Sequence, residues 1–102
     1  MLHSYLAKHL PGVITILQTH KIRNAFVFGS AVTKEFNEQS DIDLLVNFEE
    51  GLSPLEKGEL MWNLQFELED LLQRKIDLLQ ESTPKNPYFI REINASKVKV
   101  YG

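Results

Sequence analysis

Three aspartates stand where strands normally carry apolar residues. Asp41 and Asp43 open the apolar segment 41–48, and Asp77 lies within the segment 75–80. Aspartate is depleted in strands, and strand alternation would place Asp41 and Asp43 on one face, about 6–7 Å apart. Two carboxylates at that spacing repel each other by about 2 kcal/mol at an intermediate effective dielectric constant. The pattern therefore predicts that a positive charge offsets this repulsion.

A divalent cation would turn the repulsion into binding. Oxygen-only ligands favour Mg²⁺ or Mn²⁺, which bind a few carboxylates and keep positions open for water and substrate phosphate. If segment 75–80 pairs beside segment 41–48, Asp77 reaches the same patch, and we predict Asp41, Asp43 and Asp77 as metal ligands. The structural alternative is that Asp41 caps the strand entrance while the other two pair with arginine or lysine.

Gly29 and Ser30 follow the short apolar segment 24–28 directly, and ten residues separate them from Asp41. A glycine there lets the backbone approach a ligand closely, and a serine offers a hydroxyl and an amide. If residues 31–36 begin a helix, its N-terminus would face an anion. Alone, Gly-Ser after a strand is often only a turn. Its significance comes from its position ten residues before Asp41.

The hydrophobic pattern predicts the elements that must position these residues. An apolar stripe predicts a helix over 4–20, which Pro11 bends or divides. The residues Ser-Pro-Leu-Glu at 53–56 are a strong helix start, from which a stripe runs to about residue 74. An α/β (α+β) fold follows, with a mixed sheet of about four strands covered by helices. The remaining predicted elements are strands at 24–28, 41–48, 75–80 and 97–101 and a short helix at 87–95.

Composition limits the class of protein. The chain of 102 residues is 43% hydrophobic and 25% charged, as is ordinary for a globular protein, and we expect a single domain over 1–102. Residues 35–81 hold thirteen acids against three bases, which argues against a general nucleic-acid binder. The absence of cysteine excludes disulfides, thiol catalysis and cysteine-based zinc sites. No apolar run is long enough to span a membrane, so we expect a cytoplasmic protein without a membrane partner.

The combined pattern resembles the nucleotidyltransferase fold of the DNA polymerase beta superfamily. Residues 28–30 (Phe-Gly-Ser) and 40–46 (Ser-Asp-Ile-Asp-Leu-Leu-Val) are most similar to the minimal nucleotidyltransferases, the MNT antitoxins encoded beside HEPN toxins. The resemblance covers nearly the whole chain. It implies that Asp41 and Asp43 hold two metal ions, Mg²⁺ or alternatively Mn²⁺. It also implies that Asp77 completes one metal site and helps to deprotonate the attacking hydroxyl.

The reaction implied by the resemblance is attack of a hydroxyl on the α-phosphate of ATP, with transfer of AMP and release of pyrophosphate. The acceptor would be a tyrosine of the HEPN toxin, whose ribonuclease activity is thereby silenced. Gly29 and Ser30 would contact the nucleotide phosphates, and Lys34 and Arg74 are further candidates for the triphosphate. Many relatives have arginine and glycine soon after Gly-Ser, where residues 31–35 here are Ala-Val-Thr-Lys-Glu. This departure bears on nucleotide affinity more than on metal binding.

Three functions are compatible with these features. The first is a metal-dependent enzyme that AMPylates a HEPN toxin. The second is an antitoxin that neutralises by contact and has a weak active site. The third is nucleotidylation of a small molecule, for which 102 residues leave little material unless a homodimer completes a pocket. The length therefore predicts a partner that brings the acceptor, and Trp62 and Phe66 fit a core or an interface better than a base-stacking platform.

Overall fold

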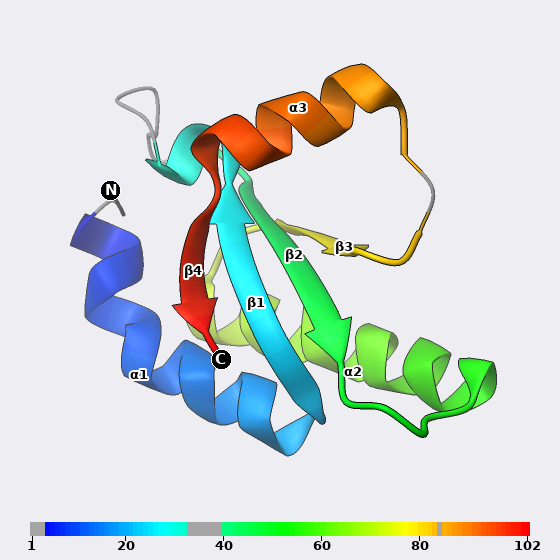
Figure 1. Cartoon of the computed structure of the whole chain (residues 1–102). Helices are drawn as coiled ribbons and strands as arrows, with labels where there is room; N and C mark the ends of the chain where they lie inside the picture. Colours follow the sequence, from blue (N-terminus) through cyan, green and yellow to red (C-terminus); the bar gives the residue numbers. More distant parts are fainter. Residues whose placement is uncertain (1–3, 33–39, 84) are drawn as a thin grey trace.

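The computed structural model describes residues 4–32, 40–83 and 85–102. The predicted α/β class is confirmed: helices and strands alternate along the chain and build one sheet with helices on both faces (Figure 1). The elements in chain order are α1 (Ser4–Thr19), β1 (Ile22–Phe28), the 3₁₀ turn η1 (Gly29–Val32), β2 (Ile42–Phe48), α2 (Pro54–Leu72), β3 (Ile76–Gln80), α3 (Pro87–Ser96) and β4 (Val98–Tyr101).

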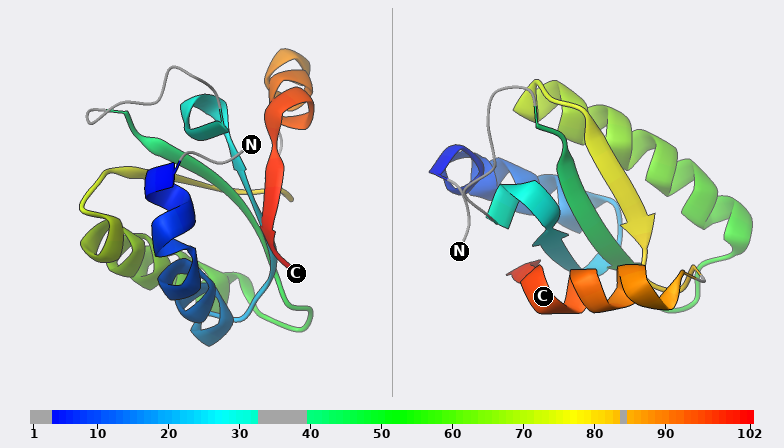
Figure 2. Two further views of the ribbon diagram at one scale, coloured as in Figure 1. Left: turned by 90° about the vertical axis from the view of Figure 1, so that its left-hand side faces the viewer. Right: turned by 90° about the horizontal axis from the view of Figure 1, so that it is seen from above.

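The four strands form a mixed sheet in the order β3-β2-β1-β4. Strand β1 pairs antiparallel with β2 and β4, whereas β2 and β3 are parallel. A parallel pair needs a crossover connection, and α2 provides it. Figure 2 shows α1 and α2 on one side of the sheet and α3 on the other. The predicted mixed, helix-covered sheet is thus confirmed.

Strand alternation divides β2 between two cores. Its even-numbered residues Ile42, Leu44 and Val46 are buried in the main core, together with residues of α1, α2 and the neighbouring strands. Leu45, on the opposite face, joins a smaller cluster with Phe28 and Ile93 beneath α3. Asp43 shares the face of Leu45 because side chains two residues apart in a strand point the same way. The aspartate of interest therefore lies on the α3 side of the sheet.

The helix ends follow from local sequence. Helix α2 begins with the expected capping box, in which the Glu56 backbone N–H donates to Ser53 Oγ at 3.1 Å and the Ser53 N–H donates to Glu56 Oε1 at 3.2 Å. It ends at Leu72. The next residue, Gln73, has backbone angles in the left-handed region, and its N–H donates to the Glu69 carbonyl. Helix α1 runs through Pro11 without interruption. None of the helices in the described part of the chain is long and apolar enough to cross a membrane.

Candidate active site

The strand register brings Asp43 and Asp77 together at one end of the sheet. In the antiparallel pair, Phe28 at the end of β1 lies opposite Asp43, and in the parallel pair Asp43 lies opposite Asp77. Gly29 begins η1 immediately after Phe28. Asp41 precedes the first residue of β2, so it lies at the strand entrance and is exposed. The predicted proximity of Asp77 to Asp43 is confirmed, while the ligand roles of the three aspartates stay predictions.

The surroundings of Asp43 disfavour the charged form of its carboxyl group. Its own burial, followed by the charges of Asp77 and Asp41 and a hydrogen bond with the Asp77 side chain, raises the pKa of Asp43 from 3.8 to about 6. A hydrogen bond between two carboxyl groups needs a proton on one of them. The pair therefore holds this proton below about pH 6, whereas near neutral pH its negative charge favours a cation, as expected for carboxylates gathered around a metal position.

The three carboxylates are not equally close. Asp43 and Asp77 make the hydrogen bond, and Asp41 acts on Asp43 through its charge. Within residues 4–32, 40–83 and 85–102, no three His, Cys, Asp or Glu side chains are grouped closely enough to hold a metal ion. The donors have the chemistry that Mg²⁺ prefers, but side-chain rotation would have to bring them onto a common ion.

Gly29 lies directly against the Asp43 carboxylate. Its φ of +72° is in the left-handed region, and a Cβ at this position would overlap Asp43 Oδ2. The sequence predicted that the backbone at this glycine approaches a ligand closely. In the structure, the group that it approaches is the Asp43 side chain. Ser30 follows in the 3₁₀ turn, which replaces the first part of the helix predicted over 31–36. Lys34 and the rest of that prediction lie outside the described residues.

Arg74 fixes the chain where it enters β2. Its Nη1 donates to the Ser40 carbonyl at 3.1 Å, and its guanidinium lies 4.5 Å from the centre of the Tyr5 ring. The Tyr5 hydroxyl donates to the Leu72 carbonyl. These contacts connect α1, the end of α2 and the residue before Asp41. No sequence signal pointed to Tyr5, because a contact across 67 positions leaves no local pattern, and the triphosphate contact of Arg74 stays a prediction.

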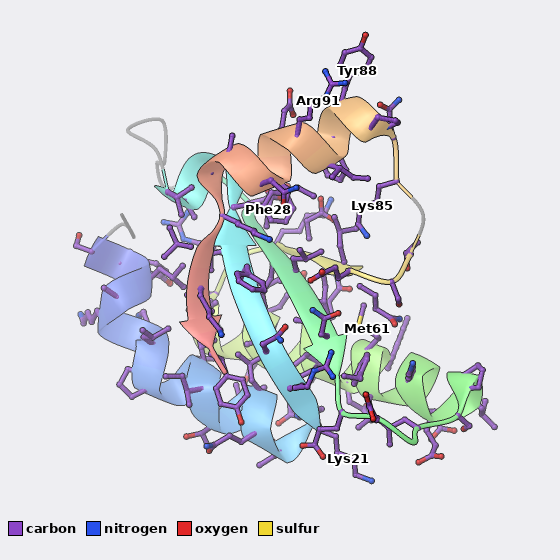
Figure 3. All side chains as sticks on the ribbon, viewed as in Figure 1. Lys21, Phe28, Met61, Lys85, Tyr88 and Arg91 are labelled. Carbon is purple, nitrogen blue, oxygen red and sulfur yellow. The ribbon has the colours of Figure 1, made fainter. Side chains whose placement is uncertain are left out.

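A cavity of about 300 Å³ lies between α3 and the sheet, on the same face as Asp43. Leu45, two residues beyond Asp43 in β2, forms part of its wall with Ile90 and Ile93. The Lys85 ammonium group donates to the carbonyl of Gln80 at the end of β3 and to those of Glu81 and Thr83 in the β3–α3 connection, and so fixes one rim. In Figure 3, Phe28 lies beneath α3 while Lys85 lies at that connection. The sheet face therefore offers partly apolar space that begins at Leu45, while Asp41, Asp43 and Asp77 do not line it.

The sequence of this chain is similar to those of known proteins. The family model described as "Polymerase beta, Nucleotidyltransferase" matches residues 12–102. Protein adenylyltransferase MntA of Thermococcus cleftensis is 39% identical over 85 residues, which cover 76% of this chain and 82% of that protein.

Two solved structures share the fold. A toxin–antitoxin with AMP-PNP matches with a TM-score of 0.71 and 21% identity, over 91% of this chain and 73% of that chain. The complex of tri-AMPylated Shewanella oneidensis HEPN toxin with MNT antitoxin matches with a TM-score of 0.66 and 18% identity, over 94% of this chain and 71% of that chain. With the family model matching most of its length, this chain belongs to the polymerase beta nucleotidyltransferase family.

Proposed function

We propose that this nucleotidyltransferase transfers AMP from ATP to a tyrosine hydroxyl of a HEPN toxin and thereby acts as an antitoxin in the cytoplasm. The observation that carries the proposal is the hydrogen bond between the Asp43 and Asp77 side chains. The charge of Asp41 acts on Asp43, and the Gly29 backbone lies against the Asp43 carboxylate. The relative named protein adenylyltransferase and the fold neighbour complexed with an AMPylated HEPN toxin support this substrate class.

The proposed reaction is a displacement at the α-phosphorus of ATP. The tyrosine oxygen forms a bond to that phosphorus, the bond to the oxygen bridging the α- and β-phosphates breaks, and pyrophosphate leaves with the bonding electron pair. The proton of the hydroxyl must go to a base as the new bond forms. We assign this role to Asp77, whose side chain is exposed to solvent.

The donor set fits magnesium. Asp41, Asp43 and Asp77 offer only carboxylate oxygens, and the raised pKa of Asp43, caused by its burial and by the nearby carboxylates, supports a cation at this site. These three residues would hold Mg²⁺, in two sites, with Mn²⁺ as the substitute. When bound, such ions supply charge neutralisation for the phosphates and orient the attacking and leaving oxygens.

The remaining site residues position the reactants. Gly29 lets the chain pass over Asp43 without displacing its carboxylate, and Arg74 holds the carbonyl of Ser40 beside Asp41. Gly29, Ser30, Lys34 and Arg74 are the proposed contacts of the nucleotide phosphates. Phosphoryl-group chemistry depends mainly on such positioning and on charge stabilisation, because little covalent help is needed.

Labelled ATP tests the reaction. The chain is incubated with Mg²⁺, ATP and a HEPN toxin protein, using ATP labelled on either the α- or the γ-phosphate. We expect α-label alone to become attached to the HEPN protein, and magnesium removal to prevent it. Attachment of γ-label would identify phosphate transfer, and attachment of neither label would contradict the proposed function.

Arg74→Lys is expected to lower kcat for AMP transfer about tenfold, with a smaller change in KM for ATP. Lysine keeps the charge but loses the planar group that stacks on Tyr5 while donating to Ser40. Arg91→Lys is the matched control, because the Arg91 guanidinium also lies over a tyrosine ring, that of Tyr88, but on the exposed side of α3. Steady-state kinetics on both variants checks this. A kcat of Arg74→Lys equal to that of Arg91→Lys would contradict the positioning role of Arg74.

A further inference from the structure

Helix α2 has two apolar faces on opposite sides. Leu64 and Leu68 are buried in the main core, and α2 covers the sheet through this face. A second set of large apolar residues points away from the core: Leu55 is 75% exposed, Trp62 80% and Phe66 70%. A helix that is apolar on two opposite faces normally has a partner on each. Within the described residues, only one of these two faces is covered.

The exposed residues form a continuous line, which we call the α2 stripe: Leu55, Gly58, Trp62 and Phe66. At about 100° per residue, Leu55, Trp62 and Phe66 fall within about 40° of one another around the helix axis. They span about 16 Å along the axis, which corresponds to three helical turns. An exposed apolar strip of this length and alignment is typical of a site that receives another helix.

Gly58 creates a notch in the α2 stripe. Apart from the adjoining residues and the backbone of α2 itself, no atom in the described part of the chain lies within 4 Å of the position that a Cβ would occupy there. The surrounding groove, of about 430 Å³, is lined by residues that include Leu55, Glu59 and Trp62. Two further grooves of about 180 and 260 Å³ share Phe66 and are bordered by acidic side chains, Glu69 in the first and Glu67 and Asp70 in the second. Glycine within a helix weakens it, whereas a notch lets a second backbone approach closely.

The charge around the α2 stripe determines which occupant fits. Helix α2 contains five acids and one base, a balance of −4. Two copies of this chain docked through their α2 stripes would bring two negatively charged helices together. Their repulsion disfavours a homodimer through this face. A helix whose apolar residues are flanked by lysine and arginine would instead meet opposite charge on both sides.

We propose that the α2 stripe docks a basic amphipathic helix of the partner protein. This inference rests on the proposed function in one respect, because the partner is taken to be the HEPN protein that receives AMP. The stripe holds the partner on the α1–α2 side of the sheet, whereas the aspartates that act on it lie at the sheet end on the α3 side. Docking and chemistry therefore use different residues and are separable by mutation.

The test measures binding of the HEPN protein to the full chain by calorimetry in the absence of nucleotide. Trp62→Ser and Phe66→Ser are each expected to raise Kd about 30-fold or more, as for central aromatic residues of an interface. Tyr88→Ser is the matched control, because Tyr88 is an equally exposed aromatic residue, 74%, on α3. We expect its Kd to stay within about twofold of wild type.

Two further variants address the notch and the charge. Gly58→Ala is expected to raise Tm, because alanine favours the helix, and to weaken binding several-fold by filling the notch. Glu59→Lys is expected to weaken binding and to reduce its dependence on salt concentration. Trp62 is the chain's one tryptophan, so its fluorescence should shift to shorter wavelength when the partner covers it.

The outcomes separate this proposal from the proposed function. Unchanged Kd in both Trp62→Ser and Phe66→Ser would overturn it. A wild-type dimer that these variants convert to monomers, with HEPN affinity unchanged, would also overturn it by assigning the stripe to a second copy. A HEPN protein that binds through the stripe but receives no AMP would leave the docking surface in place and contradict only the enzymatic function.

Discussion

Asp43→Asn is expected to abolish AMP transfer and, at the same time, to make the metal-free protein more stable. The asparagine loses a charged metal ligand, which should reduce kcat by at least about 10³-fold. It also removes the carboxylate on which burial, Asp77 and Asp41 act unfavourably. Active-site residues commonly lower the stability of the fold although the reaction requires them, and Asp43 is expected to do both.

The pH dependence of this stabilisation follows from the pKa of Asp43. The folded-state pKa, raised to about 6 from an ordinary value of 3.8, means that the folded protein binds this proton more tightly than the unfolded chain. The free energy of unfolding therefore loses a contribution as pH rises from 4 to 6, and the loss is complete above the folded pKa. After discounting for solvent screening at this half-buried side chain, we expect about 1–2 kcal/mol.

Thermal unfolding at pH 4 and pH 7.5, with chelator present, measures this effect. The Tm of Asp43→Asn should exceed that of wild type at pH 7.5, and the excess should shrink toward pH 4. Glu50→Gln is a suitable control, because the Glu50 side chain is 91% exposed and should change neither quantity. A difference between Asp43→Asn and wild type that does not vary with pH would contradict the assigned cause.

Gly29→Ala is expected to reduce AMP transfer at least about 100-fold, because two costs combine at this position. The φ of +72° is strained for alanine, which should cost about 1–2 kcal/mol of stability. The new methyl group would also overlap the Asp43 carboxylate and force it away from its position beside Asp77. Displacement of a metal ligand by a fraction of an ångström is enough to impair catalysis.

Gly51→Ala separates these two costs. Gly51 also has a positive φ, +90°, but nothing lies within 4 Å of its hypothetical Cβ. We expect the two alanine variants to lose similar amounts of stability in denaturant unfolding, and only Gly29→Ala to lose activity in the AMP-transfer assay. Full activity in Gly29→Ala would mean that the Gly29–Asp43 approach does not position the site.

Much of the site's arrangement was predictable because it depends on regular geometry. The alternation of polar and apolar residues around Asp43 predicted which face of β2 it occupies, and the parallel pairing of β2 with β3 brought Asp77 opposite it. The helix start at Ser53 was equally predictable, because a capping box is a local pattern. The face of Asp43 and the helix start require only residues close in sequence or a strand period of two. The pairing of β2 with β3 was a condition of the prediction for Asp77, and the structure meets it.

Other features depend on contacts that no local pattern encodes. The link from Tyr5 through Arg74 to Ser40 joins residues 34 and more positions apart and depends on how α1 packs beside α2. The close approach of the Gly29 backbone to the Asp43 carboxylate requires the register between β1 and β2. Trp62 and Phe66 lie in the helix that the sequence predicts, but outside its predicted apolar stripe. A core position for them is wrong, because they are largely exposed, and a period of 3.6 alone did not reveal this second apolar face.

The central claim is that the aspartate cluster transfers AMP to the HEPN partner, and intact-mass analysis of that partner tests it most directly. The HEPN protein is incubated with ATP, Mg²⁺ and either the wild-type chain or Asp41→Asn/Asp43→Asn, and modified residues are then located by peptide fragmentation. We predict a mass gain of one or more AMP groups on tyrosine with wild type and none with the double variant. No mass gain with the wild-type chain, or an equal gain with both chains, would contradict the account.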